Sequence, residues 1–111
     1  MVLVGQEMMG DLGVEENEVF RDLFDMGLQQ DGEHATTSRW LVNPHINNWE
    51  NEGLAVVRGV TVNEISTRAS RIEQLQHNYE VTVESMEGAA FHYVCLQEGI
   101  PFYKCEVSLI M

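Results

Sequence analysis

Met86 and Glu87 are the residues of this sequence best placed for ligand chemistry. They follow a β-branched segment at 81–83 and open a segment whose apolar periodicity predicts a helix, so they occupy a strand-to-helix turn. Such turns, at the carboxyl edge of a parallel sheet, are where α/β folds bind ligands. A carboxylate there can accept charge-assisted hydrogen bonds from two adjacent hydroxyl groups. From position alone two alternatives stay open: Glu87 stabilises the positive end of its helix, and Met86 fills a gap in the core.

A second polar group follows the clearest strand of the sequence, residues 54–62. It comprises Asn63 and Glu64 with Ile65, and Ser66 comes next. Taken singly, these residues are equally well explained as turn residues and a helix cap. The four histidines are scattered without metal-ligand spacing, and Cys95 and Cys105 have no paired-ligand pattern. The sequence therefore predicts no metal site and no disulfide framework.

The composition of the chain excludes two classes of binding partner. The chain has 111 residues, enough for one domain, with 18 acidic and 6 basic residues and a formal charge of −12. This charge repels phosphate backbones and anionic lipid surfaces, so we expect neither a nucleic-acid partner nor a membrane partner. The start lacks the features of a signal peptide, and no apolar run approaches the roughly 20 residues of a membrane helix. We expect a cytoplasmic protein.

The elements that position these residues can be read from periodicity. Strands are expected at Val2–Val4, where Gly5 ends the run, and then at 54–62, at 81–83 and from 100 to 102. Helices are expected at 19–27, after a cap at Ser66 or Thr67, and at 86–98, where Gly99 ends the helix. Residues 29–53 are polar and predict a long connection with limited order. The alternation of strands and helices predicts an α/β fold with a largely parallel sheet.

The two helices nearest the candidate site have recognisable apolar positions. The helix after Ser66 carries a weak apolar face, formed by Ile72, Leu75 and Tyr79. The last helix carries a stripe formed by Met86, Ala89, Ala90, Tyr93 and Val94. We expect the tryptophans, Trp40 and Trp49, to be packing anchors.

Three segments carry a resemblance to a known family. The segment Glu84-Ser85-Met86-Glu87-Gly88-Ala89-Ala90 resembles the ribose-binding signature of the nucleoside phosphorylase and nucleosidase superfamily. Residues 60–67 and 92–102 are similar to the corresponding parts of futalosine hydrolases, and the likeness extends from residue 1 to residue 102. It implies part of a three-layer α/β/α nucleoside phosphorylase-like fold, truncated at both ends, with residues 1–111 forming a single partial domain.

The resemblance also implies roles for individual residues. Met86 would pack on the ribose and Glu87 would bind its hydroxyls, while Asn63, Glu64 and Ile65 would belong to a loop that faces the base. The loop reads like the futalosine branch and not like adenine-specific nucleosidases, which favours a hypoxanthine-bearing nucleoside. The implied reaction is hydrolysis of the N-ribosidic bond of futalosine in menaquinone biosynthesis, without metal or organic cofactor, by a homo-oligomeric enzyme.

The chain departs from the family in its catalytic residues. The resemblance leads us to expect a preceding half that contains the Glu which positions the attacking water, and no match to it is found here. The position of the family's catalytic acid or amide corresponds to Ile110, and an aliphatic side chain transfers no proton. No catalytic residue of the family is therefore retained.

The last nine residues, 103–111, have a specific explanation. A permitted choice of codons for residues 102–111, read in another frame, spells the family's missing motif, Leu-Gln-Met-Arg-Gly-Ile-Ser-Asn-Tyr. We therefore expect an out-of-frame tail, from a mutation or a sequencing error, and the coding DNA across the Phe102 codon tests this.

Three interpretations stay open. The chain is a piece of a futalosine hydrolase, or a non-catalytic remnant that binds nucleoside weakly or only associates with other chains, or a piece of a methylthioadenosine/adenosylhomocysteine nucleosidase. For the isolated chain the second interpretation is favoured. Release of hypoxanthine by the purified chain would exclude it.

Overall fold

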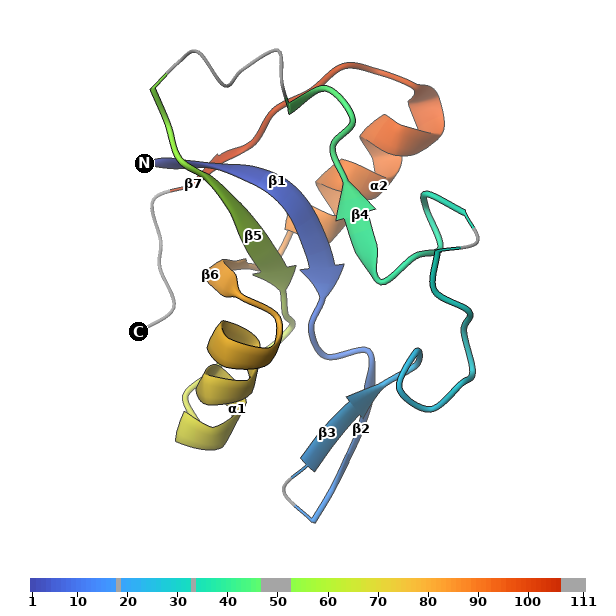
Figure 1. The fold of residues 1–111 in the computed structure, drawn as a ribbon, viewed down its shortest axis with the longest axis vertical. Helices are drawn as coiled ribbons and strands as arrows, with labels where there is room; N and C mark the ends of the chain where they lie inside the picture. The colour runs from blue at the N-terminus through green and yellow to red at the C-terminus, as the bar shows by residue number, and fades with distance from the viewer. Residues whose placement is uncertain (18, 33, 47–52, 107–111) are drawn as a thin grey trace.

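A mixed five-stranded sheet lies at the centre of the structure (Figure 1). The structure is a computed structural model, and it describes residues 1–17, 19–32, 34–46 and 53–106. The strands β1 (Val2–Met9), β5 (Val56–Thr61) and β6 (Val81–Ser85) are adjacent and parallel. Two short strands, β4 (Trp40–Val42) and β7 (Cys105–Glu106), pair antiparallel with β1. The chain is a compact mixed α/β domain, but the expectation of a largely parallel sheet holds only for β1, β5 and β6.

The first strand is longer than its apolar run predicts. We expected Gly5 to end it, whereas β1 continues to Met9. The pairing with β5 shifts register between Val4 and Gln6, on either side of this glycine. A Cβ atom on Gly5 would lie 2.7 Å from Val56 Cγ1. The glycine therefore admits a close neighbour at an irregularity in the strand and does not end it.

Helices cover both faces of the sheet. The helix α1 (Ala69–Glu73) continues into a π-helical turn, η3 (Gln74–Asn78), whose Leu75 is buried in one cluster with Met8. The neighbouring residue of β1, Glu7, points the other way and lies against Gly88 at the start of α2 (Gly88–Glu98). Because successive side chains of a strand alternate between faces, α2 and the α1–η3 segment cover opposite faces.

The start of α1 differs from the expectation. Its cap position is Arg68 and carries no side-chain hydrogen bond to the helix, so Ser66 and Thr67 are not the cap. Ser66 instead donates its backbone N–H to Glu84 Oε1 at 2.9 Å. This bond ties the loop after β5 to strand β6.

The last helix ends where it was expected to end but buries a different face. Gly99 adopts a left-handed conformation with φ of 64° and closes α2. The residues of α2 in the interior are Gly88, Ala89 and His92, whereas Tyr93 and Val94 of the expected stripe are exposed. Small residues at the start of α2 allow this helix to approach the sheet closely. His92 also lies in the interior, and its burial lowers its pKa to about 4.

The helix expected at 19–27 is absent. Val19–Asp22 is strand β3, which forms an antiparallel hairpin with β2 (Gly13–Glu16). Asn17 lies between the strands with φ of 53°, a left-handed conformation that asparagine tolerates. The hairpin packs against α1, where the Arg71 guanidinium lies 4.2 Å from the centroid of the Phe20 ring. Tertiary contacts therefore override the helical spacing of this segment.

The long connection expected at 29–53 contains the three-residue strand β4 in its described part; Trp49 and the rest of 47–52 lie outside the described residues. The expectation of a strand at 100–102 is wrong: the buried Phe102 pairs with no strand there, and its carbonyl instead accepts a hydrogen bond from the Asn43 side chain, Nδ2, at 2.8 Å. Among the described residues, no helix is long and apolar enough to cross a membrane.

Candidate functional site

The candidate site lies at the carboxyl edge of the three parallel strands. Strands β5 and β6 end at Thr61 and Ser85, and the chain then turns through Met86 and Glu87 into α2. Both turn residues are open to solvent, with 56% of Met86 and 69% of the Glu87 side chain exposed. Met86 is therefore not part of the core, which excludes the alternative that it fills a gap there.

Glu87 stands at the cap position of α2 without capping the helix through its side chain. Its carboxylate accepts a hydrogen bond from the backbone N–H of Met86, 3.2 Å from Oε2, and Lys104 Nζ lies 3.8 Å from Oε1. A different residue caps the helix, because Ser85 Oγ accepts a hydrogen bond from the N–H of Gly88 at 3.1 Å. The Glu87 carboxylate is thus accessible to a ligand from solvent.

The expected base-facing loop lies at the same edge. Asn63, Glu64 and Ile65 are all exposed, and the backbone N–H of Asn63 donates to Asp11 Oδ2 at 2.7 Å. Asn63 lines a cavity of about 260 Å³ between the end of β5 and the start of α2. Glu64 and Ile65 line a neighbouring cavity of about 290 Å³. The fold brings the two predicted groups to one edge, although Met86 and Glu87 line neither of these cavities.

Beneath this edge lies a buried carboxyl group that the sequence did not identify. Glu7 has an exposed fraction of 0%, and its Oε1 accepts hydrogen bonds from Thr61 Oγ1 at 2.8 Å and Ser85 Oγ at 3.5 Å. Its Oε2 is buried and has no hydrogen-bond partner among the described residues. A Cβ atom on either Gly59 or Gly88 would collide with this carboxyl group. The two glycines therefore make the space that Glu7 occupies.

The carboxyl group organises the start of α2 through the two hydroxyls. Thr61 Oγ1 also accepts the N–H of Ala89 at 2.7 Å, and Ser85 Oγ accepts the N–H of Gly88. Each hydroxyl thus donates towards Glu7 and accepts from the first turn of the helix. This arrangement fixes both ends of the turn that carries the two exposed residues.

Burial raises the pKa of Glu7 above its ordinary value of 4.5. The hydrogen bond from Thr61, the charge of Lys104 and the hydrogen bond from Ser85 act in the opposite direction, while the charge of Glu87 adds to the rise. Glu7 therefore keeps its proton to higher pH than an exposed glutamate would. A charged residue within an apolar strand is the sequence signal for a buried carboxyl group. This signal was missed at Glu7 because the first strand was expected to end at Gly5, before Glu7.

Lys104 connects the buried and the exposed carboxylates. Its Nζ donates to Ser85 Oγ and to Glu106 Oε2, both at 3.3 Å, and lies beside Glu87. Only 11% of its side chain is exposed. This lysine belongs to the segment 103–111 that we interpreted as an out-of-frame tail, so that segment contributes a side chain to the site. Ile110, the expected replacement for the family's catalytic group, lies outside the described residues.

In the described part of the chain, no three histidine, cysteine, aspartate or glutamate side chains are grouped so that they could hold a metal ion. The arrangement can accept hydrogen bonds at Glu87 and place an apolar thioether beside them. No known protein family, no curated protein and no solved structure matches this chain.

Proposed function

We propose that this chain contributes the sugar-binding segment of a nucleosidase of the futalosine hydrolase type. In this proposal the Glu87 carboxylate accepts hydrogen bonds from the ribose hydroxyls, and Met86 packs on the sugar. The loop that contains Asn63, Glu64 and Ile65 lies towards the base. The enzyme hydrolyses the N-ribosidic bond of futalosine to give hypoxanthine and dehypoxanthine futalosine.

One observation carries the proposal: Glu87 and Met86 are exposed side by side where β6 turns into α2. A carboxylate that binds two hydroxyl groups has to be accessible from solvent and has to be held on a fixed backbone, whereas an ordinary surface glutamate does not require a fixed backbone. Ser85 and Thr61 supply the fixed backbone by accepting hydrogen bonds from the first two N–H groups of α2. The adjoining cavity at Asn63 offers space for a planar base on the same side.

We propose further that the chain on its own binds a purine nucleoside and does not cleave it. Hydrolysis needs a group that protonates or hydrogen-bonds the leaving purine, and the corresponding residue by resemblance is Ile110. Lys104 also lies beside Glu87, so a ribose has to compete with an ammonium group for this carboxylate. Both features favour weak binding over catalysis in this chain.

The sugar hydroxyls provide the first test. We expect inosine to produce saturable ¹⁵N–¹H chemical-shift changes at residues 85–90, with 2′,3′-dideoxyinosine binding about tenfold more weakly or worse, since charge-assisted hydrogen bonds contribute roughly 1.5–3 kcal/mol. Chromatography of the same samples should show no hypoxanthine. Equal affinity for the two nucleosides would contradict the sugar-binding role, and release of hypoxanthine would contradict the non-catalytic role.

The nature of the base separates futalosine hydrolases from adenine-specific nucleosidases. In the same titration, methylthioadenosine serves as the adenine-bearing competitor. We expect inosine to bind the more tightly of the two. The reverse order would favour an adenine-type parent enzyme.

A further inference from the structure

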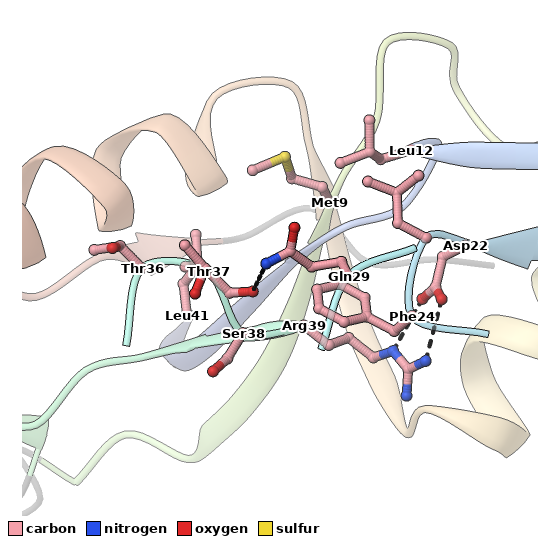
Figure 2. A pocket seen from close by; sticks show the side chains of 11 residues that line it. Met9, Leu12, Asp22, Phe24, Gln29, Thr36, Thr37, Ser38, Arg39 and Leu41 are labelled. Atoms are coloured by element: carbon pink, nitrogen blue, oxygen red, sulfur yellow. Dashed lines mark hydrogen bonds and ion pairs between the residues drawn. The ribbon is translucent and has the colours of Figure 1, made fainter. Parts of the chain in front are cut away.

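A third cavity shares Met9 and Leu12 with the cavity at Asn63. It has a volume of about 170 Å³, is partly open to solvent, and is lined by the end of β1, by β4, by the turn after β3 and by the segment 36–39 (Figure 2). Most of its wall surface is apolar and comes from Met9, Leu12, Leu23, Phe24 and Leu41, while the polar lining residues are Asp22, Gln29, Thr36, Thr37, Ser38 and Arg39. Because both cavities contact Met9 and Leu12, they are neighbours, but Met86 and Glu87 do not line this third cavity.

The charged groups at this cavity are already paired with each other. Arg39 donates from Nε to Asp22 Oδ2 at 2.9 Å and from Nη2 to Asp22 Oδ1 at 3.1 Å, as Figure 2 shows. The same Nη2 also donates to Asp25 Oδ1 at 2.9 Å. Of these three groups Arg39 and Asp22 line the cavity and Asp25 does not, so the charged lining residues form a one-to-one ion pair without net charge.

Gln29 turns a polar atom into the cavity. Gln29 donates from Nε2 to the Thr37 carbonyl at 3.3 Å, which fixes the orientation of its carboxamide. Figure 2 shows the other end of this carboxamide, the oxygen, pointing towards Met9 and into the open space. Among the described residues this oxygen receives no hydrogen bond, so it is an acceptor available to a ligand.

We propose that this cavity binds a small neutral aromatic molecule that carries one hydrogen-bond donor, of the phenol class. The size agrees, because an apolar cavity of about 150 Å³ holds a benzene ring. The apolar walls select a ring, the paired charges select a neutral ligand, and the Gln29 oxygen selects a donor group. This site is distinct from the Met86–Glu87 turn, and the inference does not depend on the proposed nucleosidase function.

Three ligands of similar size test each part of the proposal with the unmodified chain. In ¹⁵N–¹H chemical-shift titrations with phenol, toluene and benzoate, we expect phenol to bind at residues 9, 24, 29 and 41. Toluene should bind about tenfold more weakly because it lacks the hydrogen-bond donor, and benzoate about tenfold more weakly because its carboxylate loses its hydration. Benzoate binding as tightly as phenol, or no saturable shift with phenol up to its solubility, would overturn the proposal.

Two substitutions locate the binding. Gln29→Leu should lower the affinity for phenol to that for toluene, while the affinity for toluene stays the same or rises. Leu12→Trp should fill the cavity and abolish binding of both ligands, whereas the control Leu28→Trp should leave both unchanged. Leu28 is 72% exposed and does not line the cavity. Unaltered phenol binding in Leu12→Trp would overturn the assignment of the site, and the spread of amide shifts reports whether each variant is folded.

Discussion

Replacing Glu7 with alanine is expected to lower the free energy of unfolding by about 3 kcal/mol, from the cavity created and the loss of the acceptor that Thr61 and Ser85 share. The Glu7 side chain is completely buried, and its carboxyl group lies against the backbone of Gly59 and Gly88. The cavity left by alanine can therefore close only if the sheet or α2 moves. Urea unfolding followed by circular dichroism measures this change.

Glu7→Gln is the matched control, because it keeps the volume and an acceptor oxygen but cannot ionise. The pKa of Glu7 is raised in the folded protein, so between the ordinary value of 4.5 and the folded-state pKa the folded chain binds more protons than the unfolded chain. Stability of the wild type should fall as pH rises through this window, and Glu7→Gln should become the more stable protein above it. An alanine variant as stable as the wild type, or a glutamine variant with unchanged pH dependence, would contradict this account.

Replacing Arg39 with alanine is expected to cost about 3 kcal/mol of unfolding free energy, the lower end of the range for breaking a buried ion pair. Arg39 makes a two-bond contact with Asp22, whose side chain is 7% exposed, and the substitution leaves that carboxylate without its partner. The guanidinium also lies 5.2 Å from the Phe24 ring centroid and 5.7 Å from that of Tyr79. The substitution should therefore loosen the turn after β3.

Arg21→Ala is the control for this prediction. Arg21 pairs with Glu16 at 3.8 Å, but 53% and 65% of these side chains are exposed, so the loss should stay below about 0.5 kcal/mol. Equal destabilisation by the two substitutions in urea unfolding would contradict the special role of Arg39.

The contribution of Asp22 depends on pH in a defined direction. Burial alone would raise the pKa of Asp22, but the hydrogen bonds from Arg39 and from the backbone of Asp25 outweigh it and lower the pKa below 3.8. The stabilisation is therefore present above pH 3.8 and is lost as the pH falls through the folded-state pKa. In Arg39→Ala this loss at low pH should be much smaller.

Periodicity predicted the elements whose sequence pattern and tertiary environment agree. β5 and β6 are rich in β-branched residues and pair parallel with each other, and β5 also pairs parallel with β1. The helix α2 is an apolar-rich segment closed by Gly99. The same patterns placed Met86 and Glu87 at a strand-to-helix turn, and the structure has them there, exposed.

The failures have a different origin. Val19–Asp22 has helical spacing, but in the structure it pairs as a strand with β2. Its Phe20 ring packs against the Arg71 guanidinium of α1. Such contacts, distant in the sequence, cannot be seen in a local window. Glu7 was missed because Gly5 resembles the end of a strand, whereas it relieves a close contact with Val56 inside one. The role of Lys104 depends on contacts of its ammonium group with Ser85 and Glu87, which are distant in the sequence and which no spacing reveals.

The central claim is that the Glu87 carboxylate binds the hydroxyls of a nucleoside sugar. The most direct test is the dissociation constant of inosine for Glu87→Gln and for Glu98→Gln, measured by chemical-shift titration. Glu98 is an exposed glutamate at the opposite end of α2 from the cap residue Glu87, so each variant removes one negative charge at an end of this helix. We predict that Glu87→Gln weakens binding about tenfold or more while Glu98→Gln leaves it unchanged. Equal binding by Glu87→Gln and the wild type, or equal weakening by both substitutions, would contradict the claim.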